Sequence, residues 1–158
     1  MSKPKPIPDG YETTTPYLTV PDGNAAIEFY KKAFDAKEVI RMPGPDGKGV
    51  GHADLLLFDR LHIMLSDEYP DMGHRSPRTL GGTPVLLHIY VEDVDKTVDR
   101  AVAAGAKLVR PVEDQFYGDR AGGIEDPSGH HWFFATQKEI IPQGEMEKRA
   151  AEHANKKS

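Results

Sequence analysis

The sequence contains seven histidines and no cysteine, so imidazole and carboxylate groups are its main candidates for chemistry. In the stretch 50–54 (Val-Gly-His-Ala-Asp), the alternation of a β-strand places His52 and Asp54 on one face. The same alternation pairs His88 with Tyr90. Imidazole titrates near neutral pH and can transfer protons, and two imidazoles with a carboxylate suit Fe, Zn or Ni. The pattern equally fits polar residues that hydrogen-bond to one another on a partly hydrated strand.

The composition excludes several classes of protein. The 158 residues include 20 Lys and Arg against 25 Asp and Glu, whereas nucleic-acid binding requires a basic surface. The absence of cysteine excludes disulfides, zinc–thiolate sites and thiol nucleophiles. The longest apolar run, 55–58, is too short to span a membrane, and the N-terminus lacks the apolar segment of a secretory signal. We expect a cytoplasmic protein with no nucleic-acid or membrane partner.

The elements that must position these side chains follow the order β-α-β-β-β, which occurs twice. In the first half we expect a helix beginning after Asp22 or Asn24 and strands at 13–20, 37–42, 50–58 and 61–66. In the second half we expect a helix from about Val94 to Gly105 and strands at 85–91, 107–112, 122–125 and 131–136. The long loop between the halves is either a linker or a lid.

The two halves also match in their letters. The stretch 17–20 (Tyr-Leu-Thr-Val) corresponds to 88–91 (His-Ile-Tyr-Val), and both lead into a helix. Ala36-Lys37 followed by Val39 and Arg41 resembles the stretch 106–110, Ala-Lys-Leu-Val-Arg. Two such half-domains should pair their sheets, within the chain or with a partner chain.

This repeat, with the stretches 26–30 (Ala-Ile-Glu-Phe-Tyr) and 126–129 (Asp-Pro-Ser-Gly), resembles the vicinal oxygen chelate superfamily of glyoxalases, bleomycin-resistance proteins and dioxygenases. The motifs at 15–18, 91–94, 115–120 and 129–132 are similar to its PhnB-like branch. The resemblance implies an α+β fold of two βαβββ modules, the glyoxalase/bleomycin-resistance-like fold, which forms cupped mixed sheets with helices outside. It implies little about the reaction, because members share a scaffold and not one chemistry.

The resemblance also locates the metal ligands of the metal-dependent members, on the first and fourth strands of each half. These positions carry Thr15, Met64, Leu86 and Phe133, none of which is an ordinary metal ligand. No cofactor is therefore expected. Side chains two residues away on each strand should also face the cup. The resulting candidates for ligand binding on the strands are Tyr17, His52, Asp54, His62, Met64, His88, Tyr90, His131 and Phe133.

Three interpretations of these candidates remain open: structural polar residues, substrate-binding or proton-transferring groups, and a displaced site for Zn, Ni, Fe or Mn built from His52, Asp54 and His88. Phe116, Tyr117 and Arg120 are further candidates, because an aromatic pair with an arginine suits a flat or anionic ligand. A structural hairpin explains them equally well. Trp132 should face the helix side and belong to the core.

The expected organisation is an N-terminal arm (1–10), a single domain (11–140) and a peripheral C-terminal helix and tail (141–158). The domain consists of modules 11–68 and 84–137, joined by the loop 69–83. We expect a homodimer, because closing an open cup against a second sheet removes apolar surface and strand edges from water.

The expected function is binding of a small molecule in the cup, as a drug-sequestering protein or a metal-independent enzyme. The alternative is a metal-dependent lyase, isomerase or dioxygenase that uses the displaced site. His88 is expected to matter most, because the apolar stretch 85–91 predicts a central strand in which a buried histidine needs a partner.

Overall fold

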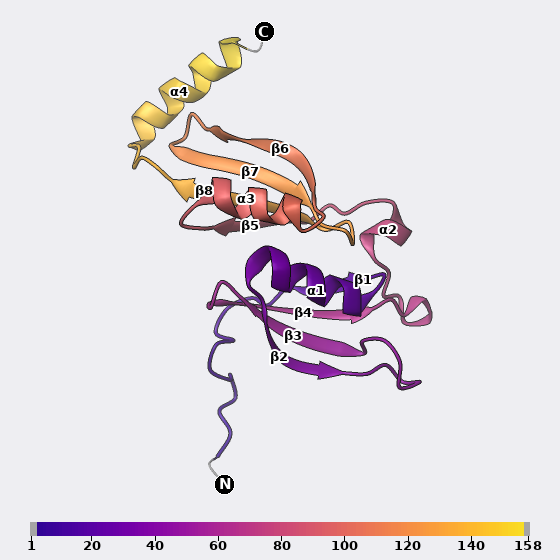
Figure 1. Cartoon of the computed structure of the whole chain (residues 1–158). Coiled ribbons are helices and arrows are strands. Elements are labelled where there is room, and N and C mark those ends of the chain that lie inside the picture. The colour runs from indigo at the N-terminus through magenta and orange to yellow at the C-terminus, as the bar shows by residue number, and fades with distance from the viewer. Residues whose placement is uncertain (1–2, 157–158) are drawn as a thin grey trace. The chain divides into compact units, whose positions relative to one another are not determined.

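The computed structural model describes residues 3–156 and divides the chain into two compact units (Figure 1). The first unit ends at Thr83 and also includes Pro127–His130. The second unit consists of Pro84–Asp126 and the chain from His131 onward. Within the described residues, no helix is both long and apolar enough to cross a membrane.

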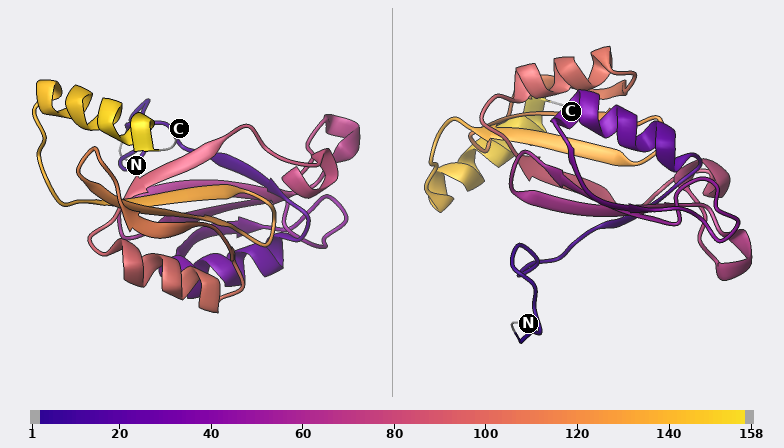
Figure 2. Two further views of the ribbon diagram at one scale, coloured as in Figure 1. Left: turned by 90° about the horizontal axis from the view of Figure 1, so that it is seen from above. Right: turned by 60° about the horizontal axis from the view of Figure 1, so that its bottom comes forward.

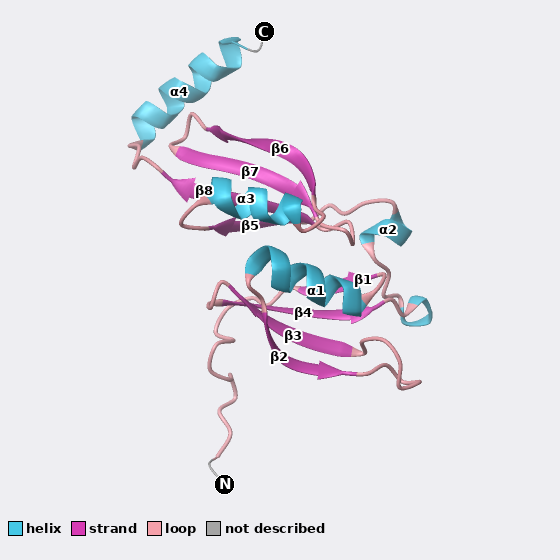
Figure 3. Ribbon diagram, viewed as in Figure 1, coloured by secondary structure: helices cyan, strands magenta, loops and turns pink. Residues whose placement is uncertain are grey.

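The first unit is a four-stranded mixed sheet with one main helix. The strands lie in the order β1-β4-β3-β2, with β1 parallel to β4 and the other neighbours antiparallel. Two short helices follow in the connection to the second unit, as Figure 3 shows by colour. The elements are β1 (Tyr17–Val20), α1 (Gly23–Phe34), β2 (Lys37–Met42), β3 (His52–Leu57), β4 (Leu61–Asp67), η1 (Pro70–Met72) and α2 (Pro77–Leu80).

The second unit repeats this arrangement. Its strands lie in the order β5-β8-β7-β6, with β5 parallel to β8. Two rotated views show each main helix lying along one face of its own sheet (Figure 2). The prediction of two βαβββ modules is confirmed. The elements are β5 (Leu86–Tyr90), α3 (Val94–Ala103), β6 (Lys107–Asp114), β7 (Asp119–Glu125), β8 (His131–Gln137) and α4 (Gln143–Lys156).

The core of each unit lies between its sheet and its main helix. In the first unit, Ile27 and Tyr30 of α1 are fully buried, as are Leu55 and Leu57 of β3. Burying such apolar side chains is the main driving force for this packing. In the second unit, Trp132 is fully buried, stacks on Phe134 and donates an indole hydrogen bond to Asp126, as expected for a core residue.

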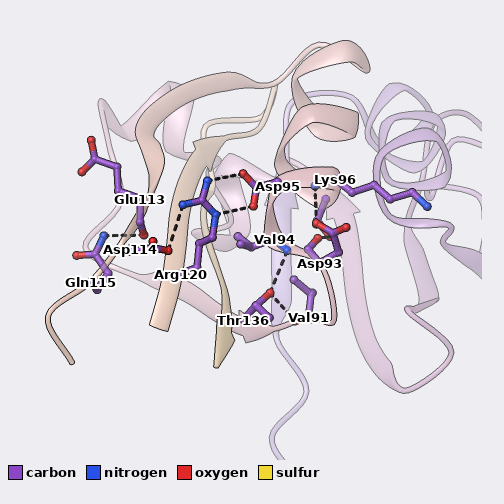
Figure 4. A network of polar contacts seen from close by, with 11 residues as sticks. Val91, Asp93, Val94, Asp95, Lys96, Glu113, Asp114, Gln115, Arg120 and Thr136 are labelled. Atoms are coloured by element: carbon purple, nitrogen blue, oxygen red, sulfur yellow. Dashed lines mark hydrogen bonds and ion pairs between the residues drawn. The ribbon is translucent and has the colours of Figure 1, made fainter. Parts of the chain in front are cut away.

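A polar side chain from the last strand holds the start of the main helix in both units. The Asp67 carboxylate accepts hydrogen bonds from the backbone N–H groups of Gly23 and Val50. A Cβ at Gly49 would lie 2.1 Å from this carboxylate, and φ there is +58°, so only glycine fits. In the second unit the Thr136 hydroxyl accepts from the N–H of Val94, which Figure 4 shows.

Two sequence expectations about secondary structure are wrong. The first is the start of the first strand, which begins at Tyr17 and not at residue 13; Pro16, directly before it, has no N–H to donate. The predicted connection 69–83 contains two short helices, and whether it acts as a linker or a lid stays a prediction; it is anchored by Glu68, whose carboxylate accepts from the N–H of Ser76. Hydrogen bonds from Thr79 and Ser76 lower the pKa of Glu68.

The second error concerns the strand that contains His88. β5 lies at the edge of its sheet, not at the centre, and His88 is exposed. The long apolar run suggested a strand buried on both faces. In the structure Leu86 is 54% exposed, so the face of β5 that carries Leu86 and His88 is not buried within the unit. The expected desolvation cost at His88 therefore does not arise in this structure.

Candidate functional site

Each sheet has a face opposite its main helix, which we call its cup face. Strand register defines it, because directly paired residues point to the same side of a sheet. Helix-facing Ile63 and Leu65 are fully buried, whereas Tyr17 and Tyr90 on the cup faces are 49% and 50% exposed. The cup face of the first unit carries Tyr17, Thr19, Lys37, Ile40, Met42, His52, Asp54, Leu56, His62, Met64 and Ser66. That of the second carries Leu86, His88, Tyr90, Lys107, Arg110, Glu113, Asp119, Ala121, Gly123, Glu125, His131, Phe133, Ala135 and Gln137.

The first cup face brings together all five candidates predicted from that half of the chain. Met64 of β4 is paired with Tyr17 on one side and with Asp54 on the other. His52 lies two residues before Asp54 on β3, and His62 lies two residues before Met64 on β4. The predicted shared face of these residues therefore agrees with the register.

The more exposed polar pair on this face is formed by Tyr17 and His52. The Tyr17 hydroxyl lies 2.9 Å from His52 Nδ1, and the two ring centroids are 5.5 Å apart. The contact orients both rings and leaves the Nε2 atom of His52 outside it. A phenol and an imidazole joined in this way can bind a polar group or move a proton on a bound molecule.

The second polar group on this face is a closed network around Asp54. This carboxylate is only 2% exposed; one of its oxygens lies 2.8 Å from His62 Nδ1, and the other accepts the Tyr11 hydroxyl. Hydrogen bonding to Asp54, together with burial and the carboxylate charge, raises the pKa of Tyr11 to about 12. Both Asp54 oxygens are thus engaged, so this network is better suited to holding the N-terminal arm on the sheet than to binding a ligand directly.

The second cup face brings together four further candidates. His88 and Tyr90 have ring centroids 5.3 Å apart, and the Tyr90 hydroxyl donates to Asp119 Oδ2 at 2.7 Å. That hydrogen bond, with burial and the Asp119 charge, raises the pKa of Tyr90. His131 Nε2 lies 3.5 Å from Glu125 Oε2. Several polar side chains on this face are therefore held in place by partners within the same unit.

Phe133 occupies the middle of the second cup face. His88 of β5 pairs with Phe133 in register, and Gly123 of β7 pairs with it on the other side. The guanidinium carbon of Arg110 lies 5.2 Å from the Phe133 ring centroid, a cation–π contact. This face thus combines aromatic rings with two exposed cations: Arg110, which lies over the Phe133 ring, and Lys107, which is in register with Glu125.

The candidates near the start of β7 lie elsewhere. Phe116 and Tyr117 contact each other, and Phe116 also contacts His153 of α4. Arg120 points to the helix side of the sheet, where it donates two 2.7 Å hydrogen bonds to Asp95 (Figure 4). These contacts lower the pKa of Asp95 and raise that of Arg120. Arg120 thus connects α3 to β7 and is bonded to the carboxylates of Asp95 and Asp114.

Arg120 also contributes to a polar cavity at this end of the second unit. The cavity has a volume of about 370 Å³, and neither Phe116 nor Tyr117 lines it. Its lining is polar, whereas small-molecule sites are mostly apolar with a few polar groups. The lining residues are Asp114, Gln115, Gly118, Asp119, Arg120, Lys138 and Glu139.

The residues at the superfamily's metal positions do not fit a metal. Thr15 precedes β1, and Met64, Leu86 and Phe133 offer a thioether and two hydrocarbon side chains. Among the residues that the structure describes, no three His, Asp or Glu side chains gather as a metal site. Of the proposed displaced ligands, Asp54 contacts His62 and Tyr11, and His88 belongs to the other unit.

Sequence reasoning did not single out several residues that shape these faces. Tyr11 was missed because nothing near it in the sequence signals a contact with Asp54, 43 positions away. Asp95 and Asp119 were missed as partners of Arg120 and Tyr90, which only the tertiary structure brings within reach. Arg110 was noticed in the internal repeat but not as a cup residue; the repeat matched it to Arg41, which faces the helix side, so no signal in the sequence gave its face.

Comparison with known proteins places this fold among characterised families. A profile of the Glyoxalase/Bleomycin resistance protein/Dioxygenase superfamily matches residues 12–134. An uncharacterized protein of Mycobacterium bovis is 51% identical over 121 residues, which are 75% of this chain and 78% of that protein. The crystal structure of TioX from Micromonospora sp. ML1 is 25% identical with a TM-score of 0.61, covering 79% of this chain and 99% of TioX. A PhnB protein of Bacillus cereus, 19% identical with a TM-score of 0.61 and covering 79% of this chain and 99% of that one, shares the fold.

Proposed function

This chain belongs to the Glyoxalase/Bleomycin resistance protein/Dioxygenase superfamily, and we propose that it binds a small organic molecule on its cup faces. The superfamily resemblance expected from the sequence is confirmed, and it leaves the ligand open because the scaffold supports many functions. The nature of the ligand has to be argued from the side chains on these faces.

One observation carries the proposal: aromatic and polar side chains on the cup faces are exposed yet held in fixed positions. Tyr17 is 49% exposed, and its hydroxyl is already bonded to His52. Tyr90 is 50% exposed, and its hydroxyl is bonded to Asp119. Binding sites for small molecules combine apolar walls with a few preorganised polar groups, because preorganisation lowers the entropic cost of binding.

A thermal-shift screen against antibiotics and aromatic metabolites, followed by calorimetric titration of the hits, tests the proposal. Tyr17→Phe and His52→Ala should each weaken binding of a hit that uses this pair by about tenfold, the value of one good hydrogen bond. His74→Ala is the control, because His74 is an exposed histidine outside both sheets. The proposal fails if no compound binds, or if no cup-face substitution changes binding more than His74→Ala does.

The same experiment separates sequestration from catalysis. A drug-sequestering protein returns its ligand unchanged, whereas a metal-independent enzyme converts it, with Tyr17 and His52 as the pair that would transfer a proton. Mass spectrometry of the ligand after prolonged incubation distinguishes the two outcomes.

The metal-dependent alternative has weaker support, because Asp54 already binds His62 and Tyr11. Metal analysis of protein purified without chelators or a polyhistidine tag tests it. Stoichiometric Zn, Ni, Fe or Mn that is lost in His52→Ala or His88→Ala would favour this alternative over a metal-independent cup.

We also propose a homodimer, and a cytoplasmic location remains a prediction that cell fractionation would test. The support for a dimer is the apolar surface left on sheet faces and edge strands. Sedimentation at micromolar concentration should give twice the mass of one chain, and the mass of a single chain would refute the dimer. The large apolar residues 40–54% exposed on the strands are Tyr17, Val39, Ile40, Met42, Leu86, Tyr90, Leu108 and Val109.

A further inference from the structure

The corresponding strands β2 and β6 turn their arginines to opposite faces of their sheets. Arg41 pairs in register with Ala53, which is fully buried on the helix side, and it binds Glu38 and Asn24. Arg110 pairs with Gly123, on the cup face. The irregularity in register falls at the corresponding place in both strand pairs, so Arg110 occupies the position of Ile40, and Arg41, one residue further along its strand, faces the other side.

Arg110 is the outer layer of a stack built on the backbone of β7. Gly123 has no side chain, and the Phe133 ring lies over it: a Cβ there would be 2.9 Å from the end of the ring. The guanidinium lies over the same ring at 5.2 Å. Among the described residues, the ring is the one partner that the structure gives to Arg110, whereas Arg41 has a carboxylate and an amide.

A guanidinium placed over an aromatic ring keeps its N–H donors free at its edge. These donors form a planar fork that matches a carboxylate with two parallel hydrogen bonds. The other charged groups that the register places on this face are Lys107, Glu113, Asp119 and Glu125. Asp119 and Glu125 interact with Tyr90 and His131. Phe133, the ring at the middle of the face, has the guanidinium of Arg110 over it. Charge complementarity therefore favours an anionic group at Arg110.

The surroundings of Arg110 indicate what should be attached to that anionic group. Phe133 and His88 lie side by side on adjacent strands, and Tyr90 contacts His88. Such a row of rings offers flat, largely apolar contact area, which favours a flat ligand.

We infer that Arg110 anchors the carboxylate of a flat aromatic ligand whose ring system contacts Phe133, His88 and Tyr90. This inference rests on the proposed binding function and names the chemical class of the ligand for the second cup face. It also predicts that the overall negative charge of the protein does not decide ligand charge at this face, because the guanidinium of Arg110 lies directly over the Phe133 ring.

Three matched probes test the inference: 2-naphthoate, its neutral amide 2-naphthamide, and the cation 2-naphthylmethylammonium. Affinities are measured by calorimetric titration at low ionic strength for the unmodified protein, Arg110→Gln and Arg41→Gln. We expect naphthoate to bind the unmodified protein about tenfold more tightly than the amide, and the cation to bind least tightly. Arg110→Gln should remove the preference for the anion, while Arg41→Gln, the control from the first unit, should keep it.

Equal affinity for naphthoate and the amide would overturn the inference, as would an equal effect of the two arginine substitutions. If none of the probes binds but the thermal-shift screen finds other ligands, this inference is wrong and the proposed binding function stands. If the screen also finds none, both are wrong. Because Arg110 is exposed, Arg110→Gln should fold normally, and unchanged melting confirms that its effect is on binding.

Discussion

The two units carry equivalent rows of four residues across their cup faces, and the rows differ in where the charge lies. In the first unit the charged residue is on β3, inside the sheet, and it is buried. In the second unit it is on the edge strand β6, and it is exposed. The rows are Tyr17–Met64–Asp54–Ile40 and His88–Phe133–Gly123–Arg110.

Position in the sheet decides what a charged group can do. A buried carboxylate must have its hydrogen bonds satisfied within the protein, and Asp54 has both oxygens engaged by His62 and Tyr11. An exposed arginine at a strand edge is still hydrated, so Arg110 needs no internal carboxylate and can exchange water for a ligand. The charged group of the first row is therefore fully bonded within the protein, whereas Arg110 of the second row is exposed and has an aromatic ring as its partner.

The largest expected difference between the two rows is in stability. Asp54→Ala leaves His62 and Tyr11 without their shared acceptor and should lower the free energy of unfolding by about 3 kcal/mol. Arg110→Ala loses one exposed cation–π contact and should cost about 0.5 kcal/mol. Urea denaturation monitored by circular dichroism measures both, and equal costs would contradict the contrast between a buried and an exposed charge.

The next effect concerns the small residue that replaces Asp54 in the second row. Gly123→Ala would put a Cβ 2.9 Å from the Phe133 ring, so the ring must move, and we expect a loss of about 1–3 kcal/mol. Gly144→Ala in α4 is the control, since nothing lies within 4 Å of its added Cβ and alanine favours a helix. A Gly123→Ala protein as stable as the control would show that the ring does not rest on the sheet backbone.

A smaller effect concerns how stability depends on pH through Tyr11, which donates a hydrogen bond to Asp54 of the first row. The pKa of Tyr11 rises from its ordinary 10.0 to about 12 in the folded protein, so its contribution to stability is fully present below pH 10 and is lost as pH rises through 12. Tyr11→Phe should cost about 1.5 kcal/mol at neutral pH, and its cost should shrink between pH 10 and 12. Tyr17→Phe retains Tyr11 and should leave that part of the pH dependence in place. Denaturation curves at several pH values would refute the prediction if Tyr11→Phe cost the same throughout.

The smallest effect concerns the ion pair that connects α3 to β7. Arg120 lowers the pKa of Asp95 below its ordinary 3.8, so this contribution is present above pH 3.8 and is lost on further acidification. Because Asp95 is half exposed, Asp95→Asn should lower the melting temperature by only ~1–2 °C at neutral pH. High salt should reduce the difference, and a salt-independent difference would argue against an electrostatic origin.

Local patterns in the sequence were sufficient for most of the fold. The apolar stripe through Ile27, Tyr30 and Phe34 predicted α1, and strand alternation placed His52 and Asp54 on one face. Errors occurred where the pattern does not report the neighbours of a strand. The apolar run around His88 is compatible with a central strand and with an edge strand whose exposed face is still apolar, and periodicity cannot distinguish these cases.

By itself, the sequence determined the βαβββ repeat and the faces on which the candidate residues lie, because these depend on periodicity and on spacing along the chain. Its motifs resembled those of the superfamily that the profile match then showed. Only the tertiary structure decided which polar groups meet: Tyr11 with Asp54, Tyr90 with Asp119, and Arg110 with Phe133. These contacts depend on strand order and on register, which bring together residues far apart in the chain. Arg110 lies opposite Gly123 as Ile40 lies opposite Asp54, whereas Arg41, one residue further along its strand, faces the helix side. Because adjacent residues of a strand point to opposite faces, the match between Arg41 and Arg110 in the repeat could not show the face of Arg110 until the register was known.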